Sequence, residues 1–154
     1  MRRYDKLIFV SNSDTAMGPM AEAILQSKYL LDELTIMSKG VVVLFPEPIN
    51  PKAEAVLVSN GLTMKEHMSD PLTKEDFEER TLILAVDETV KQKAQNEIAP
   101  EGEEICALCE YVGETQDVIN PYGGALAEYG QCYAQLDALI KKLVVQLNEE
   151  ELLR

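Results

Sequence analysis

Basic residues are scarce in this chain. Lys and Arg number 14 against 27 Asp and Glu, which gives a formal net charge of −13. This charge would repel a nucleic acid or an anionic membrane surface, so the sequence predicts no partner of either kind. It also disfavours anionic ligands, unless a local group of backbone amides overrides the field of the whole protein.

Cysteines are few, and long hydrophobic runs are missing. Three cysteines in 154 residues favour a reducing compartment over a disulfide scaffold, so we expect a cytoplasmic protein. No apolar run has the length of a membrane span. Residues 1–6 are basic and lead into a short apolar run without a cleavage site, which indicates a first strand rather than a signal peptide.

Histidine occurs once, as His67, and this limits metal and redox chemistry. Cys106 and Cys109 form a C-x-x-C motif, but such a pair needs a second thiol pair or histidines at suitable spacing to act as a metal or redox site. Cys132 stands alone, and the motif falls at the end of an expected strand. We therefore interpret the pair as inert core cysteines and predict neither a metal nor a cofactor.

What the chain does contain is an alternation of apolar strands and helices. Strands are expected at 6–10, 33–37, 81–86 and 105–108, with 41–44 as a further extended apolar run. Helices are expected at 20–31, 51–60, 87–98 and 125–147, with a short helix beginning at 73. This order predicts one α/β domain over residues 1–154, with a parallel sheet of about four strands and helices on both faces. Ligands of such sheets bind at the carboxyl ends of the strands, where Ser11 and Asp87 lie.

The most informative segment is residues 7–23, in which a buried strand, a small polar loop and a helix opened by Pro19 follow one another. Such a unit can hold phosphate at the N-terminus of its helix. The loop supplies the candidate ligand-binding residues Asn12, Ser13, Asp14, Thr15, Ala16 and Gly18.

This segment resembles the signature of the low-molecular-weight protein tyrosine phosphatases, in which a strand ending V-C is followed by x-G-N-x-C-R-S and then P-M-A-E. Thr15 matches a Thr that the bacterial branch of this family carries in the loop, and that branch includes the protein-arginine phosphatases. Further similar segments occur in the same order, and together they imply the phosphotyrosine protein phosphatase I-like fold. They are Met37-Ser38-Lys39-Gly40-Val41, His67 to Phe77, Val86-Asp87-Glu88 and Asn120-Pro121-Tyr122-Gly123-Gly124.

The resemblance places the family's nucleophilic Cys at Ser11, its phosphate-clamping Arg at Met17 and its general-acid Asp at Asn120. A serine hydroxyl needs an adjacent base to act as a nucleophile. Methionine offers no donor to phosphate oxygens, and an amide gives up no proton near neutral pH. We therefore predict a pseudophosphatase without catalytic activity that binds a protein partner, a second copy of itself or a ligand, and that holds phosphate weakly. The alternative is a residual phosphomonoester or protein-phosphate hydrolase that uses Ser11.

Four smaller expectations concern the loop and its rim. If the family's Gly position requires a positive φ, Ser13 strains the loop, whereas Asp14 tolerates such a conformation better. We expect the Asp14 carboxylate to turn onto the loop amides and to occupy the phosphate cradle as an internal anion. Asn120 is interpreted as a turn residue before Pro121. Tyr122 is the best candidate for an exposed aromatic side chain that binds a partner.

Overall fold

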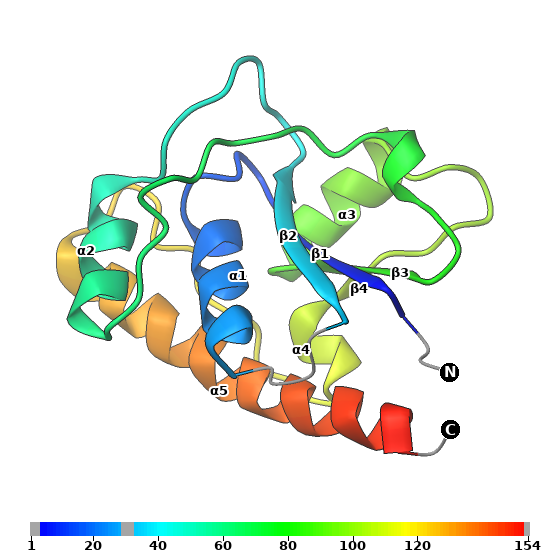
Figure 1. The fold of residues 1–154 in the computed structure, drawn as a ribbon. Coiled ribbons are helices and arrows are strands. Elements are labelled where there is room, and N and C mark those ends of the chain that lie inside the picture. Colours follow the sequence, from blue (N-terminus) through cyan, green and yellow to red (C-terminus); the bar gives the residue numbers. More distant parts are fainter. Residues whose placement is uncertain (1–3, 29–32, 153–154) are drawn as a thin grey trace.

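Alternating strands and helices build the chain, of which the computed structural model describes residues 4–28 and 33–152. Their arrangement is drawn in Figure 1. In chain order the elements are β1 (Lys6–Ser11), α1 (Met17–Lys28), β2 (Thr35–Gly40), α2 (Pro51–Ser59), the 3₁₀ helix η1 (Lys74–Asp76), β3 (Thr81–Ala85), α3 (Glu88–Glu97), β4 (Cys106–Ala107), α4 (Leu108–Tyr111) and α5 (Leu126–Leu152).

The four strands form one parallel sheet in the order β2-β1-β3-β4. β1 lies between two neighbours, with Ser11 opposite Gly40 of β2 and Val10 opposite Ala85 of β3. Residues 7–10 are 0% exposed, which explains why β1 is a continuous apolar run rather than an alternating one. The predicted α/β fold with a four-stranded parallel sheet is confirmed.

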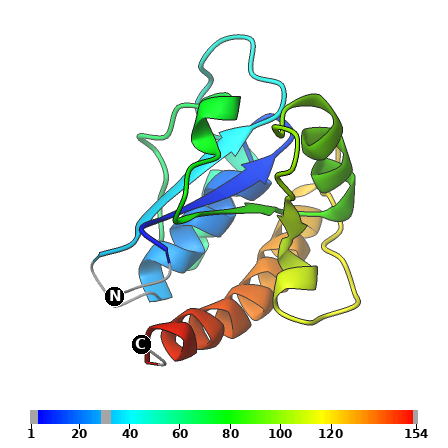
Figure 2. The same cartoon turned by 90° about the vertical axis from the view of Figure 1, so that its right-hand side faces the viewer.

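Helices cover both faces of this sheet, as Figures 1 and 2 show from two directions. α1 connects β1 to β2 on one side of β1, and α3 connects β3 to β4 in the opposite direction. Because such crossovers are right-handed, the two helices lie on opposite faces. The connections that follow β1 and β3 run in opposite directions across the sheet, and the carboxyl ends of these two strands therefore flank the crevice in which such sheets bind ligands.

α5 is the long helix at the bottom of Figure 1, and it packs against α1 and α2. Apolar residues recur along it at helical spacing, and those at Tyr129, Leu136, Ile140, Leu143 and Leu147 are buried. Leu126 shares this spacing but is 52% exposed, because it stands in the first turn of the helix, beyond the core. Among the elements of residues 4–28 and 33–152, no helix has both the length and the apolar composition of a bilayer span.

The main differences from the predicted elements lie at their ends. The first helix begins at Met17 rather than Met20, and its predicted last residues, 29–31, lie outside the described residues. Residues 41–44 do not continue the sheet, since the N–H groups of Val41 and Val42 donate to the carbonyls of Ser11 and Asn12. This run instead follows the polar loop, and its Leu44 is 88% exposed. Leu108 leaves the last strand and opens α4.

Truncation of a buried leucine in α5 tests this account of the core. Leu143 is 0% exposed, and Leu143→Ala is expected to lower the free energy of unfolding by roughly 2–5 kcal/mol, through lost apolar burial and the cavity left behind. The matched control is Leu126→Ala on the same helix, which should cost less than about 1 kcal/mol. Urea denaturation followed by circular dichroism measures both. Equal losses in the two variants would contradict the assigned helix face.

Candidate active site

A cleft of about 570 Å³ lies at the carboxyl ends of β1 and β3. It is lined by Ser11 at the end of β1, by Met17 at the start of α1 and by the polar loop between them. Asn120 and Tyr122, from the segment before α5, also line it. The three positions that the sequence singled out for catalysis thus meet in one cleft, although more than 100 residues separate two of them from the third. The lining is Ser11, Asn12, Ser13, Thr15, Ala16, Met17, Val42, Asn50, Asp87, Thr89, Val90, Lys93, Asn120, Tyr122 and Tyr129.

Ser11 is the last residue of β1 and is 5% exposed. Its Oγ accepts a hydrogen bond from the backbone N–H of Asp14 at 3.1 Å, as expected for a serine that accepts a loop amide. A Cβ atom at Gly18 would lie 2.8 Å from this Oγ, so the first turn of α1 approaches the serine closely only because residue 18 is glycine. Among the described residues, no carboxylate or imidazole contacts the hydroxyl.

The position of the Asp14 side chain contradicts the prediction that its carboxylate occupies the phosphate cradle as an internal anion. Its side chain is 0% exposed, lies outside the lining of the cleft, and accepts the N–H of Asp70 through Oδ2 at 3.0 Å. The Nε2 of His67 lies 3.6 Å from the same Oδ2 and 2.7 Å from the Asp14 carbonyl oxygen. The carboxylate is therefore turned away from the cradle, where groups distant in sequence hold it. His67 thus has a structural role, since it contacts both the carbonyl oxygen and the carboxylate of Asp14.

Positive φ falls on Asp14, at +58°, and not on Ser13. Aspartate tolerates this left-handed conformation better than most residues, so the loop closes without the strain that was expected at Ser13. The end of β2 supports the turn from outside. A Cβ atom at Gly40 would lie 2.9 Å from the Ser13 carbonyl carbon and 3.0 Å from the Asp14 nitrogen. The backbone of the loop is thus closely packed against β2.

The loop amides remain available to a ligand. The N–H of Asp14 donates to Ser11 Oγ. Within residues 4–28 and 33–152, the other loop N–H groups donate to no protein acceptor. With the N-terminus of α1 behind them, these groups form a cradle of the kind that attracts anions. They belong to Asn12, Ser13, Thr15, Ala16, Met17 and Gly18.

The rim of the cleft has the features predicted for Asn120 and Tyr122. The Oδ1 of Asn120 accepts the N–H of Tyr122 at 2.9 Å, which confirms Asn120 as a turn residue before Pro121. Tyr122 is 89% exposed, as an aromatic contact residue must be, while its role in binding a partner stays a prediction.

Sequence reasoning missed Lys93 of α3. Its Nζ donates to the Oδ1 of Asn12 at 3.0 Å, which brings a positive charge to the mouth of the loop. Helical spacing was the signal that could have found it, because Lys93 follows Thr89 and Val90 by four and three residues and so shares their face of α3. Asp87 caps the same helix by accepting the N–H of Val90 at 2.9 Å, and burial raises the pKa of its carboxyl group.

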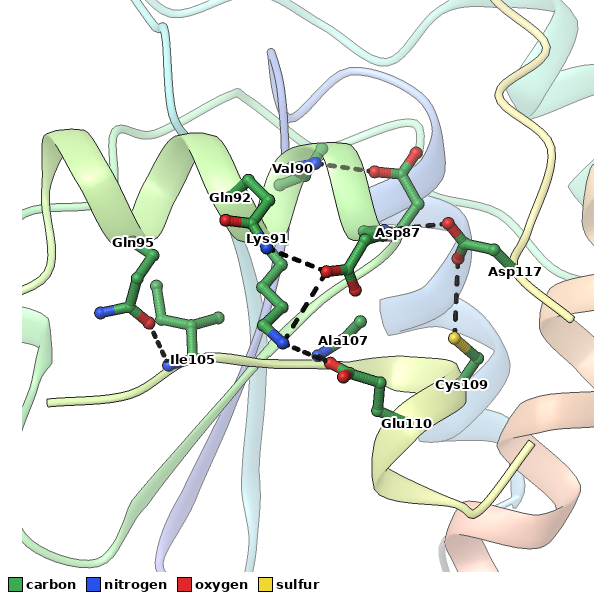
Figure 3. A network of polar contacts seen from close by, with 11 residues as sticks. Asp87, Val90, Lys91, Gln92, Gln95, Ile105, Ala107, Cys109, Glu110 and Asp117 are labelled. Atoms are coloured by element: carbon green, nitrogen blue, oxygen red, sulfur yellow. Dashed lines mark hydrogen bonds and ion pairs between the residues drawn. The ribbon is translucent and has the colours of Figure 1, made fainter. Parts of the chain in front are cut away.

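A polar network anchors α3 behind the cleft (Figure 3). Lys91 donates to Glu110 of α4 at 2.8 Å, and the backbone N–H of Glu88 donates to Asp117 at 3.0 Å. The S–H of Cys109 also points at Asp117, with a sulfur–oxygen distance of 3.7 Å. Cys106 and Cys109 are both free thiols, and burial raises the pKa of each, which favours the unreactive protonated form.

Comparison with known proteins agrees with this architecture. The family profile described as low molecular weight phosphotyrosine protein phosphatase matches residues 6–152. The chain belongs to this family. It is 32% identical over 142 residues to the low molecular weight protein-tyrosine-phosphatase PtpB of Staphylococcus haemolyticus, which covers 90% of this chain and 96% of that protein. It is 31% identical over 147 residues to the protein-arginine-phosphatase of Bacillus subtilis, with 94% and 97% covered.

Two solved structures of family members show the same fold. The YwlE arginine phosphatase from Geobacillus stearothermophilus matches with a TM-score of 0.86 and 28% identity, over 96% of this chain and 95% of that chain. A cysteine-to-serine variant of a YwlE arginine phosphatase, in which the active-site serine is phosphorylated, matches with a TM-score of 0.85 and 31% identity, over 97% and 99% of the two chains.

The buried carboxyl group of Asp14 gives this family member a pH-dependent stability. Burial raises its pKa from 3.8 to about 6, and the nearby Ser38 hydroxyl, the charge of His67 and the amide of Asp70 offset only part of this effect. Asp14 Oδ1 and the hydroxyl of Ser38 are buried without a partner among the described residues. Because the folded-state pKa is raised, the contribution of Asp14 to stability is fully present below about pH 4 and is lost as the pH rises through 6.

Asp14→Asn is therefore expected to stabilise the protein at about pH 8, by up to about 3 kcal/mol, and to change little at about pH 4. The neutral amide keeps the size of the side chain and removes the buried charge. Urea unfolding across this pH range measures the effect. The control is Asp70→Asn, since the Asp70 side chain is 60% exposed and pairs with Lys39 at 2.9 Å. If Asp14→Asn kept the pH dependence of the parent chain, the assignment to Asp14 would be wrong.

Proposed function

We propose that this member of the low-molecular-weight phosphatase family is a pseudophosphatase, which uses the cleft to bind a ligand or a protein partner without catalytic turnover. The observation that carries the proposal is the composition of the cleft. Ser11, Met17 and Asn120 line it together, at the positions where the resemblance puts thiol, guanidinium and carboxylic acid. The cleft therefore lacks all three groups at those positions.

Each replacement removes a different part of the chemistry. The hydroxyl of Ser11 has no base in contact among the described residues, so it stays protonated at neutral pH. Met17 is 5% exposed and offers no hydrogen to phosphate oxygens as charge develops on them. Asn120 has an amide in place of an acid, and its oxygen already accepts the N–H of Tyr122. General acid–base catalysis alone contributes roughly 10²–10⁴ to such rates.

Binding is less affected than catalysis in this proposal. The unbonded loop amides belong mostly to residues that line the cleft and favour an oxyanion there, although the interaction is weaker without the guanidinium. Relatives named as protein-tyrosine and protein-arginine phosphatases make a phosphorylated side chain of a protein the natural class of ligand. Tyr122 at the rim is positioned to contact the rest of such a partner, or a second copy of this chain. We place this interaction in the cytoplasm.

Turnover assays test the proposal directly. The purified chain is expected to release no phosphate above the buffer rate from p-nitrophenyl phosphate or from a phosphoarginine peptide. The triple variant Ser11→Cys, Met17→Arg, Asn120→Asp is expected to gain measurable turnover, because the scaffold that aims these side chains is intact. Ser11→Cys alone is the matched control and should remain far slower, since clamp and acid are missing. Turnover by the parent chain that Ser11→Ala abolishes would overturn the proposal.

A second candidate function is a residual hydrolase that begins with phosphoryl transfer to Ser11. The phosphorylated serine in the YwlE variant favours it, because a serine at the nucleophile position of that relative carries a phosphoryl group. In this chain the Ser11 oxygen would attack the phosphorus of a phosphoarginine. The P–N bond would break, the serine proton would pass to the departing guanidine nitrogen, and a phosphoserine would remain. Hydrolysis of that ester would be slow without the acid at position 120.

Intact-mass spectrometry distinguishes this second candidate. After incubation with a phosphoarginine peptide, the chain is expected to gain the mass of one phosphoryl group, and Ser11→Ala is expected to gain none. Ser13→Ala is the control, since residue 13 lies in the same loop and its hydroxyl contacts Thr15 at 2.7 Å. No mass gain, or an equal gain in Ser11→Ala, would contradict transfer to Ser11.

A further inference from the structure

The charged side chains that line the cleft are few. Among its described lining residues only Asp87 and Lys93 carry charge. The Asp87 carboxylate would repel an anion that enters the loop, and Met17 adds no positive charge to oppose it. Lys93 is therefore the group that decides whether the lining is neutral or negative.

We propose that Lys93 has taken over the charge of the missing loop guanidinium, so that a phosphate-type oxyanion is bound between the loop amides and the Lys93 ammonium. This inference rests on the proposed function, because it requires that the cleft still receives a phosphoryl ligand. It assigns a specificity residue on α3, a different element from the loop that carries the family's Arg position.

The position of Lys93 supports this role. Its Nζ donates to the side chain of Asn12, the residue that directly follows Ser11, at 3.0 Å. An ammonium group has three donors, so two remain for a ligand while Asn12 keeps the lysine at the mouth of the loop. Lys93 is partly buried as a residue, but its contact with Asn12 is exposed, so the ammonium group is accessible to a ligand that enters from solvent.

α3 holds the Lys93 backbone in place. The helix is capped by Asp87 at its N-terminus and tied to α4 by the Lys91–Glu110 ion pair, and Asp117 accepts the N–H of Glu88 (Figure 3). Val90, one turn before Lys93, is 5% exposed and packs into the core. The lysine thus extends from a fixed helix, and only its own flexible stem has to move when a ligand enters.

The chemistry of lysine separates binding from catalysis. A guanidinium binds two phosphate oxygens in a planar fork, whereas an ammonium is a compact point charge on a flexible chain. Lys93 is thus suited to attract and hold an anion in its ground state. It has no fixed pair of donors for the geometry that develops during phosphoryl transfer, which agrees with a ligand that is held rather than hydrolysed.

Titration with inorganic phosphate tests this role, with loop amide shifts in ¹H–¹⁵N NMR spectra as the readout. Lys93→Gln is expected to weaken phosphate binding at least about tenfold, the effect of losing one hydrogen bond to a charged group. Lys93→Arg keeps the charge and should stay within about threefold of the parent chain. The matched control is Lys141→Gln on α5, which changes the net charge equally, is 66% exposed and lies outside the cleft lining.

The outcomes separate this inference from the function it rests on. Equal phosphate affinity in Lys93→Gln and the parent chain overturns the role of Lys93, and so does an equal weakening in Lys141→Gln, which would indicate a bulk charge effect. A parent chain whose loop amides do not respond to phosphate also overturns it. Phosphate release that depends on Ser11 would overturn the pseudophosphatase proposal instead, and it leaves the Lys93 comparison unaffected.

Discussion

The turn at Asp14 is the constraint on which the cleft depends. Its backbone takes a φ of +58°, its N–H donates to Ser11 Oγ, and its carbonyl oxygen lies 2.7 Å from His67 Nε2. These interactions fix the path of the loop, and the neighbouring amides donate to no acceptor among the described residues. The same turn sends the carboxylate into the interior, where burial raises its pKa to about 6. The turn that shapes the cradle therefore also buries the Asp14 carboxyl group, and burial of its charged form is unfavourable.

The three positions that the resemblance assigns to catalysis have structural roles in this fold. Ser11 accepts a loop amide, Asn120 accepts the amide of Tyr122, and Met17 is 5% exposed at the start of α1. Ser11 and Asn120 therefore satisfy local backbone groups, a role that involves no reaction. The proposed binding role of the cleft is compatible with the family fold for this reason. The proposed role of Lys93 fits the same logic, since it adds charge from α3 without altering the loop.

Sequence patterns predicted the sheet and the loop position well, because both follow from local periodicity and turn chemistry. The continuous apolar run of β1 and the helical spacing in α5 are signals of this kind. The direction of Asp14 depends on Asp70 and His67, which lie 56 and 53 residues away, and no local pattern encodes such a contact. Helical spacing puts Lys93 on the same face of α3 as Thr89 and Val90, but its contact with Asn12 spans 81 residues, and the spacing alone does not show that this face meets the loop.

Gly18 and Gly40 have a consequence for how the cleft could change over time. Both glycines form the close packing that shapes the loop, and neither adds a side chain to the cleft. The loop backbone is thus shaped by two positions that contribute no side chain to the cleft. A side chain at Gly40 would have to displace the backbone at Ser13 and Asp14, and so would deform the cleft without changing any residue that lines it. The shape of the cleft and the groups that face a ligand are therefore set by different residues.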